Sequence, residues 1–493
     1  MVDSFGILVA WGVATSALVS AQSGSAHKPN YRTSPLDGSK IALPTKQQLA
    51  FQDNEIGVLI HFDPSQYLGL NGCNEDPELV PKPELFDPAK LDTGQWMDAA
   101  ASLGAKFATL VAKHNCGFVT WPTETTFPLR DNSTQEYNYT VAESPLHGFD
   151  LVGSFKESAE ERGILRGIYY SLNVNNFLNV QDWSVRDGPL AWGQVGIAND
   201  TYDEIVMDQL AEIWSGYGDL TEIWFDGGYS EAQMEFLIEL LHTYQPQAAI
   251  FNGCDTEGTC VSANSVRWIG NEDGEAPEEN WSTGVTNDGG DAESPYFCPA
   301  VCDTTVQVDT QWFYNKDKAL RPLSELIDVY HASVGRNCIL ELNLTPNGDG
   351  LVPDDHVALY RQLGEFINSC YGEPVGDDQA VHHVSDEDGT YSIIFDTPQF
   401  IDRIVLMEDQ TEGQVIRSYE VQGRVTENNG GVDATAPEAD SWTTLSKGTS
   451  IGHKKIDLFG EAVEVSEAIL EWHTQFGCAI VMASISFNAS QSL

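Results

Sequence analysis

Short apolar runs alternate with amphipathic stretches between about residue 50 and residue 370. Most of these runs are continuously apolar rather than strictly alternating, which is typical of parallel strands that are covered on both faces. The pattern predicts strands at residues 57–62, 107–114, 166–172, 221–227, 248–252, 267–272, 311–314 and 339–344.

Helical patterns lie between most of the predicted strands, at residues 93–103, 151–162, 203–217, 232–244, 323–334 and 356–369. Asp150 and Ser230 are expected to cap helices, and Gly104, Gly163 and Gly335 to end them. The alternation predicts an α/β fold with a (β/α)8-like (TIM) barrel, irregular at the fifth and sixth crossovers, where no helical pattern is found. An open doubly wound sheet is the alternative, which the lack of a Gly-rich phosphate fingerprint after any strand disfavours.

The pattern changes near residue 372. Short β-type runs at 390–398, 401–407, 417–425, 462–472 and 478–487 are separated by polar turns, including a polar loop at 428–440. We therefore expect a barrel over residues 46–372, followed by an antiparallel β-sandwich over residues 373–493.

The first residues resemble a targeting segment. Residues 5–19 are apolar and Val19-Ser20-Ala21 fits a small-residue cleavage site, although the preceding residues contain no Lys or Arg. We expect residues 1–21 to be a signal peptide, residues 22–45 to be an N-terminal lead, and the protein to be secreted and extracellular. An uncleaved buried helix is the alternative, and no other stretch is long and apolar enough to span a bilayer.

Charge narrows the range of partners. The 493 residues include 25 Lys and Arg against 74 Asp and Glu, which gives a net charge of −49. Such a chain repels phosphate backbones, so we expect no nucleic-acid partner, and an anionic membrane surface is disfavoured for the same reason. A hydrophobic content of 41% is sufficient for a large core.

The chain has nine cysteines, some of which should pair in an oxidising compartment. Spacing favours Cys254–Cys260 first and Cys298–Cys302 second, whereas zinc-ligand spacing is absent. Glycosylation sequons begin at Asn132, Asn138, Asn199, Asn280, Asn343 and Asn488. Asn343 lies in a strand-like run, so we expect it to remain unmodified.

Two carboxylates follow different predicted barrel strands, Asp226 and Glu272. In such barrels reactive groups gather at the carboxyl ends of the strands, and a carboxylate pair without a metal motif suits glycoside hydrolysis. Aromatic residues near the strand ends suit a sugar ligand, although core packing explains any one of them alone. They are Trp121, Tyr169, Tyr170, Trp224, Phe225, Trp268 and Trp281.

Several motifs resemble those of the α-L-fucosidases, glycoside hydrolase family 29. They are Gly57-Val-Leu-Ile-His61-Phe, Ala112-Lys113-His114-Asn115-Cys116-Gly117-Phe118 with Trp121-Pro122, Gly167-Ile-Tyr169-Tyr170-Ser171, Glu222-Ile-Trp224-Phe-Asp226-Gly227, Arg267-Trp268-Ile-Gly-Asn271-Glu272 and Ser333-Val-Gly335-Arg336-Asn337-Cys338. The resemblance covers roughly residues 50–370, in order.

The resemblance implies an exo-acting, retaining enzyme that releases terminal α-L-fucose from oligosaccharides or glycoconjugates and needs no metal or other cofactor. Asp226 matches the family's nucleophile and Glu272 its general acid/base. Six residues match or neighbour fucose-contacting positions: His61, His114, Asn115, Tyr169, Trp224 and Trp268. A retaining mechanism predicts carboxyl groups about 5–5.5 Å apart.

The chain also departs from the family pattern. Asn115 stands where members have a second His, and Cys116 where they have Asp. Cys73 lies where a Glu-Trp pair is common. Because Cys73 and Cys116 both replace expected residues at the pocket mouth, we expect them to form a disulfide.

Other interpretations stay open at this point. The general acid could be another residue of the same acidic loop: Asp273, Glu275, Glu278, Glu279 or Glu293. The chain could instead be a non-catalytic sugar-binding protein on the same barrel, a glycosidase for another terminal sugar, or a wall protein attached through its β-sandwich. Linkage preference, natural glycan and oligomeric state do not follow from the sequence.

Overall fold

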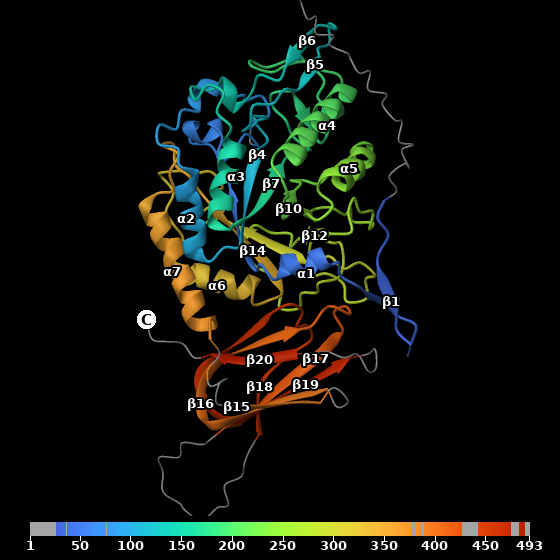
Figure 1. Ribbon diagram of the computed structural model, residues 1–493, viewed down its shortest axis with the longest axis vertical. Coiled ribbons are helices and arrows are strands. Elements are labelled where there is room, and N and C mark those ends of the chain that lie inside the picture. The colour runs from blue at the N-terminus through green and yellow to red at the C-terminus, as the bar shows by residue number, and fades with distance from the viewer. Residues whose placement is uncertain are drawn as a thin grey trace, which may run out of the picture.

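The computed structural model describes residues 26–35, 37–74, 76–373, 375, 380–385, 389–425, 442–474 and 483–488. Eight parallel strands close into a barrel in the order β10-β11-β12-β13-β14-β3-β4-β7 (Figure 1). They are β3 (Ile56–Ile60), β4 (Phe107–Lys113), β7 (Leu165–Tyr170), β10 (Glu222–Trp224), β11 (Ala249–Phe251), β12 (Ser265–Trp268), β13 (Ala300–Thr304) and β14 (Cys338–Leu344). The barrel prediction is confirmed, and the continuous apolar runs are explained because nearly every strand residue is buried.

The seventh strand is not where the sequence pattern placed it, so the prediction of a strand at 311–314 is wrong. The strand is β13, whose Val301 pairs with Trp268 on one side and Ile339 on the other. β13 is short and contains a buried Asp303, so it lacks a strong apolar run. The aromatic side chains of Trp312 and Phe313 instead pack in a loop against His61, with ring centroids 5.1 and 5.2 Å away.

The helices follow the predicted amphipathic patterns closely. They are α2 (Thr93–Leu103), α3 (Leu151–Arg162), α4 (Asn199–Gly216), α5 (Glu231–Tyr244), α6 (Leu323–Ser333) and α7 (Asp354–Tyr371). Asp150 and Ser230 accept the backbone N–H of Gly153 and Gln233, as their capping positions predict. Gly104 and Gly163 end α2 and α3 in left-handed conformation.

The helix end at Gly335 has a different cause. α6 is capped by Val334 in right-handed conformation. A Cβ on Gly335 would lie 2.4 Å from the carbonyl oxygen of His331, so glycine is required there by close packing rather than by a left-handed turn.

No helix fills the crossovers between β11 and β12 and between β12 and β13, as predicted. A short helix, α1 (Lys46–Gln52), precedes the first barrel strand, and the described part of the N-terminal lead forms a hairpin of β1 (Tyr31–Thr33) and β2 (Lys40–Ala42). Short hairpins β5–β6 (Thr126–Pro128 and Thr134–Glu136) and β8–β9 (Val180–Gln181 and Ser184–Val185) project from the crossovers. The predicted signal peptide lies outside the described residues.

The C-terminal part is an antiparallel β-domain, as predicted. Its strands form one six-stranded sheet that encloses a separate hydrophobic core. They are β15 (Ala380–Ser385), β16 (Thr390–Glu408), β17 (Ile416–Val425), β18 (Trp442–Gly448), β19 (Lys455–Thr474) and β20 (Ala483–Asn488). Two predicted runs merge in β16, whose pairing with β19 changes register at bulges. The predicted polar loop at 428–440 lies outside the described residues.

The β-domain packs beside α6 and α7 (Figure 1). The backbone N–H of Asn337 donates to Lys454 O and that of Ile456 to Gly335 O, both at 2.9 Å. Glu278 forms ion pairs with Arg336 at 2.5 Å and with Lys455 at 3.0 Å. Barrel and β-domain are thus joined by backbone hydrogen bonds and charged contacts together.

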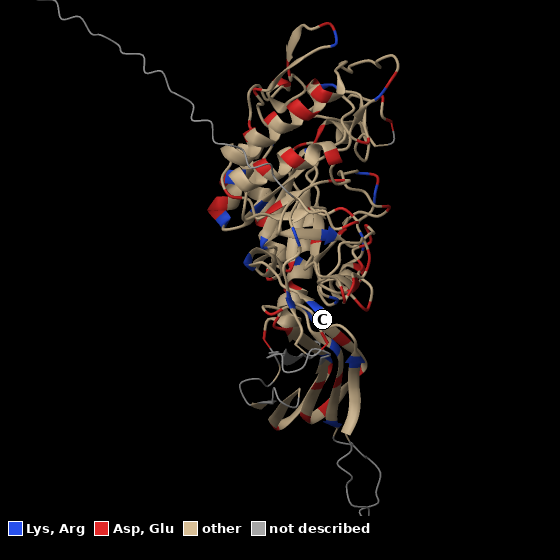
Figure 2. Cartoon of the chain, turned by 90° about the vertical axis from the view of Figure 1, so that its right-hand side faces the viewer, with Lys and Arg blue, Asp and Glu red and all other residues tan. Residues whose placement is uncertain are grey.

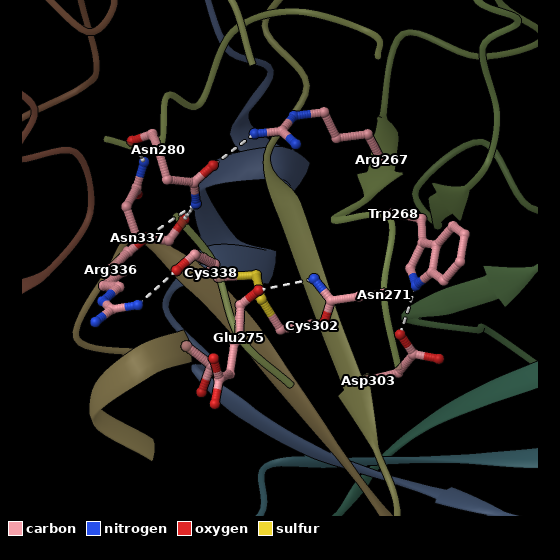
Figure 3. Close-up of a disulfide and its surroundings, with 12 residues drawn as sticks. Arg267, Trp268, Asn271, Glu275, Asn280, Cys302, Asp303, Arg336, Asn337 and Cys338 are labelled. Carbon is pink, nitrogen blue, oxygen red and sulfur yellow. Dashed lines mark hydrogen bonds between the residues drawn. A yellow bond between two sulfur atoms is a disulfide. The ribbon is translucent and has the colours of Figure 1, made fainter. Parts of the chain in front are cut away.

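Three disulfides occur among the described residues: Cys73–Cys116, Cys254–Cys260 and Cys302–Cys338. The first two confirm predictions. The predicted pair Cys298–Cys302 is wrong, because Cys302 on β13 faces Cys338 on the adjacent strand β14, while Cys298 is buried outside any disulfide (Figure 3). Spacing along the chain cannot find such a pair, because the two cysteines become neighbours only when β13 and β14 pair side by side. Cys478 lies outside the described residues.

Candidate active site

A cavity of about 400 Å³ opens where the barrel strands end. Its wall contains four carboxyl groups, Asp226, Asp255, Glu272 and Asp303, together with the indoles of Trp224 and Trp268. Asp226 follows β10, Glu272 follows β12, and Asp303 lies within β13. The barrel therefore brings together the two carboxylates that the strand-end argument selected, and it adds Asp303. The fourth, Asp255, lies in the loop closed by the Cys254–Cys260 disulfide.

Asp226 lies in a partly enclosed position against Tyr169. The Tyr169 hydroxyl donates to Asp226 Oδ2 at 2.5 Å. Burial raises the pKa of Asp226, while this hydrogen bond and the positive charge of Lys113 lower it again. The contacts with Tyr169 and Lys113 thus both favour the ionised carboxylate of Asp226, which is the form that a nucleophile requires.

Lys113 is a buried cation beneath the cavity. Its ammonium donates to the carbonyl oxygens of Ser171 and Val174 and lies 4.6 Å from the centre of the Tyr170 ring. Burial lowers the pKa of Lys113 to about 7, although the charge of Asp226 raises it. Lys113 belongs to the Ala112–Phe118 motif, but the motif alone does not indicate that its ammonium is buried close enough to Asp226 to lower the pKa of that carboxyl.

Glu272 lies in a more open position, at the mouth of the same cavity. Partial burial raises its pKa, as do the charges of Asp226 and Asp273, and an interaction with the Trp312 side chain lowers it. Negative neighbours thus favour the protonated form of Glu272, whereas Tyr169 and Lys113 favour the ionised form of Asp226. This difference in surroundings separates an acid from a nucleophile.

Asp303 was not among the site residues predicted from the sequence, because the strand that contains it was not predicted. Its carboxyl accepts a hydrogen bond from the Trp268 indole at 2.7 Å (Figure 3). Burial raises the pKa of Asp303 to about 8, an increase to which Glu272 and Asp226 add and which the Trp268 hydrogen bond opposes. Asp303 is therefore protonated at neutral and acidic pH, and it fixes the orientation of an indole that lines the cavity.

Two histidines and a chain of aromatic rings form a wall next to the cavity, which this wall reaches through Trp224 and Phe251. The rings of His61 and His114 lie 5.5 Å apart, and each lies within 6 Å of the Tyr169 ring. Tyr169 stacks on Trp224 at 5.0 Å, and Trp224 on Phe251 at 3.7 Å. Burial lowers the pKa of His114 to about 3 and that of His61 as well, so both imidazoles are neutral and can donate or accept hydrogen bonds.

Asn115 joins this wall to the first disulfide. Its amide donates to Asn74 Oδ1 and its Oδ1 accepts from the Ser171 hydroxyl at 2.8 Å. The neighbouring Cys116 is bonded to Cys73. Asn115 is consequently a fixed, non-titrating group whose hydrogen bonds run within the protein.

The rival acids of the 272–293 loop lie in other surroundings. Glu278 pairs with Arg336 and Lys455, Glu279 accepts from Trp281 and Thr449, and Glu293 lies 4.0 Å from Arg417. These contacts tie them to the interface with the β-domain. Among the loop acids Glu272 lines the cavity that contains Asp226.

Two further acids, Glu222 and Glu341, fill the barrel interior. The Thr109 hydroxyl donates to Glu222 at 2.5 Å. Burial raises the pKa of Glu222 to about 7, against the hydrogen bonds with Glu341 and Thr109, and burial together with the charge of Glu222 raises the pKa of Glu341. Among the described residues no group of His, Cys, Asp and Glu side chains has the arrangement of a metal site. In that same part of the chain, every helix is too short or too polar to cross a membrane.

Known proteins resemble this chain in sequence and in fold. A family model described as Alpha-L-fucosidase matches residues 3–373. Alpha-L-fucosidase 1 of Arabidopsis thaliana is 29% identical over 353 residues, which cover 67% of this chain and 61% of that protein.

Solved structures are similar over most of the chain. A glycoside hydrolase family 29 fucosidase of Ruminococcus gnavus, determined in complex with fucose, gives a TM-score of 0.72 at 20% identity, covering 95% of this chain and 97% of that one. A family 29 member from a rumen bacterium gives 0.72 at 23% identity, covering 92% and 78%. These likenesses show a shared fold.

Proposed function

The chain belongs to the α-L-fucosidase family of glycoside hydrolases, and from this premise we propose that it is a secreted, exo-acting, retaining α-L-fucosidase. The observation that carries the proposal is the cavity in which Asp226 and Glu272 meet under opposite electrostatic influences. The substrate would be a terminal α-L-fucosyl residue of an oligosaccharide or glycoconjugate. Trp224 and Phe251 give this cavity an apolar surface that suits the methyl group of a 6-deoxy sugar.

The reaction would proceed in two displacements. In the first, an Asp226 carboxylate oxygen forms a bond to C1 of fucose while the bond from C1 to the glycosidic oxygen breaks, and Glu272 gives its proton to that oxygen. In the second, Glu272 takes a proton from water, whose oxygen attacks C1 and releases Asp226. Fucose leaves with its original anomeric configuration, and Glu272 regains its proton.

The surrounding side chains support both steps. The Tyr169 hydroxyl steadies the Asp226 carboxylate through its 2.5 Å hydrogen bond. His61 and His114 are neutral and can hydrogen-bond the sugar hydroxyls without competing as proton donors. Trp268, fixed by Asp303, offers a flat surface for a sugar ring.

Kinetic comparison of variants tests these roles. Asp226→Asn should lose almost all turnover of 4-nitrophenyl α-L-fucoside while keeping the fold. Glu272→Gly should fail on natural fucosides but retain activity on activated aryl fucosides, with partial rescue by azide. Glu275→Gly is the matched control in the same loop and should remain active.

Other outcomes would redirect the proposal. Normal activity of Glu272→Gly on natural fucosides would remove Glu272 from its role. A panel of nitrophenyl glycosides on which another sugar is cleaved fastest would identify a different terminal sugar. Binding without turnover of any glycoside would indicate a non-catalytic sugar-binding protein.

Secretion rests on the N-terminal segment and is supported by the disulfides, which persist in oxidising compartments. Expression of the complete chain in a eukaryotic host, followed by N-terminal sequencing of the protein in the medium, tests it. The expected first residue is Gln22. Retention of the whole chain inside the cell would contradict the proposal.

A further inference from the structure

A second cavity, of about 370 Å³, lies on the barrel and shares no lining residue with the first. Lys82, Asn138, Tyr139, Phe177 and Trp192 are among its lining residues. We call it the Trp192 groove. None of the catalytic roles argued above uses it.

The side chain of Trp192 has an exposed fraction of 69%, the highest of the large apolar side chains among the described residues. The loop that presents it is tied down at Gln194, whose side-chain amide donates to the carbonyl oxygens of Pro77 and Asn176 at 3.0 Å. Gln194 Oε1 also accepts the N–H of Ala191 at 2.9 Å. A large indole held in water by a hydrogen-bonded loop points to a surface that is covered in the working protein.

The walls of the Trp192 groove fit a pyranose ring. Tyr139 and Phe177 stack at 5.1 Å and are both buried, and the Tyr139 hydroxyl is anchored on Pro81 O at 2.7 Å. The Lys82 ammonium lies 5.0 Å from the centre of the Trp192 ring. Aromatic faces bordered by polar groups match the C–H face and the hydroxyl or acetamido groups of a sugar.

Asn138 places a glycosylation sequon at the wall of this groove. It begins the sequon Asn138-Tyr139-Thr140 and is exposed, whereas its neighbours Tyr137 and Tyr139 are buried. Gln135 donates to Asn138 Oδ1 at 3.4 Å, and Nδ2 makes no hydrogen bond to any described residue. The nitrogen that accepts a glycan is therefore available at the groove wall.

Among the sequon asparagines whose side chains the structure describes, Asn132, Asn199, Asn280 and Asn343 do not line the Trp192 groove. Asn280 and Asn343 are buried in hydrogen bonds to backbone carbonyls, which excludes modification in the folded protein. Asn132 is exposed at the turn between β5 and β6, near Asn138 in sequence. Asn132 is accordingly the matched control for Asn138.

We propose that Asn138 carries an N-linked glycan whose first N-acetylglucosamine packs against Trp192. The bond forms between Nδ2 and C1 of the sugar, as C1 leaves the diphosphate of a lipid-linked oligosaccharide donor and Nδ2 loses a proton. The proposal rests on the proposed secretion. The substrate glycan as occupant of the groove is the alternative, which the experiment distinguishes.

The experiment uses the full chain secreted from a eukaryotic host. Glycopeptide mass mapping should find Asn138 occupied. Asn138→Gln should lower the Tm by about 1–2 °C, since a covered aromatic surface becomes exposed. Thr134→Val, which removes the Asn132 sequon and leaves the left-handed backbone of Asn132 (φ 63°) untouched, should leave the Tm unchanged. In the Trp192→Ala background, Asn138→Gln should cause no further decrease, because the partner ring is already gone.

Enzymatic trimming locates the contact on the first sugar. An endoglycosidase that leaves one N-acetylglucosamine should preserve the Tm, and complete removal of the glycan should lower it. An unoccupied Asn138, or additive effects of the Asn138 and Trp192 substitutions, would overturn the proposal. The proposal would also be overturned if bacterially produced protein, which carries no glycan, bound a free fucosylated oligosaccharide and the Trp192→Ala variant did not.

Failure of this proposal is separable from failure of the proposed function. Hydrolysis of 4-nitrophenyl α-L-fucoside, measured on every variant, reports the catalytic site and should be unchanged by Asn138→Gln and Trp192→Ala. If the native leader does not direct secretion, a heterologous leader in place of residues 1–21 still exposes Asn138 to glycosylation. The glycan result then stands apart from the localisation result.

Discussion

Asp226, Glu272 and Asp303 line one cavity, and their contacts give each a different protonation behaviour. Asp226 is stabilised as a carboxylate by Tyr169 and Lys113, Glu272 is raised in pKa by its acidic neighbours, and the pKa of Asp303 reaches about 8 through burial. The sequence supports the first two assignments because both residues follow apolar runs. It could not supply the third, because a buried aspartate inside a five-residue strand resembles a turn.

Tyr169 provides a test of the Asp226 assignment. Tyr169→Phe removes the 2.5 Å hydrogen bond while keeping the ring that stacks on Trp224. A hydrogen bond to a charged group contributes about 1.5–3 kcal/mol, so kcat/KM should fall about 10–100-fold. The acidic limb of the pH profile should also move to higher pH, because the pKa of Asp226 rises. A fall in kcat/KM with an unmoved limb would contradict this role.

The raised pKa of Asp303 predicts how the stability of the folded protein changes with pH. Its folded-state pKa of about 8 lies above the ordinary value of 3.8, so its contribution to stability is present at low pH and is lost as pH rises through about 8. Asp303→Asn removes this loss and keeps a neutral acceptor for Trp268. Thermal unfolding should therefore show the variant gaining Tm relative to the natural protein between pH 5 and pH 8. An equal difference at both pH values would contradict it.

Secondary-structure elements were predictable where local signals agree with the fold. Asp150 and Gly163 correctly mark the two ends of α3, and Ser230 correctly marks the start of α5, because capping residues act within one turn of the helix. β13 could not be predicted, because its burial depends on its barrel neighbours rather than on its own composition. The strand was predicted at residues 311–314 instead, because the aromatic run that contains Trp312 and Phe313 has the composition of a strand although it fills the barrel mouth as a loop.

The disulfides between and within these elements should differ in their contribution to stability. Cys302–Cys338 closes 36 residues of sequence separation and links two barrel strands, whereas Cys254–Cys260 closes six. Loop entropy grows with length, so Cys302→Ala/Cys338→Ala should cost about 2–4 kcal/mol of unfolding free energy, and Cys254→Ala/Cys260→Ala less. Chemical denaturation of both double variants measures this. The reverse ranking would contradict the assignment.

The complete protein combines a scarcity of cations with an acidic surface. Acidic residues are spread over helices and loops of the barrel and over the β-domain (Figure 2), in accordance with the net charge of −49. Some of the few cations, among them Arg336 and Lys455, lie between the barrel and the β-domain. This placement indicates that the interface is part of the stable structure.

Truncation after Gly372 tests that interpretation. It would remove the Lys454 carbonyl that pairs with Asn337 N–H, and the Ile456 side chain that packs against the barrel core. We expect the truncated barrel to be insoluble, or to unfold at a clearly lower temperature in a thermal scan. A truncated barrel with unchanged Tm and lost polysaccharide binding would instead assign the β-domain to attachment.

The assignment of Asp226 and Glu272 can be tested by trapping the covalent intermediate. A 2-deoxy-2-fluoro-fucosyl fluoride forms the glycosyl-enzyme quickly, and this intermediate is hydrolysed slowly. Peptide mass spectrometry of the treated protein therefore identifies the nucleophile. The proposed mechanism predicts a single 2-fluorofucosyl adduct on the peptide that contains Asp226, and none in Asp226→Asn. An adduct on another residue, or continued turnover without an adduct, would contradict it.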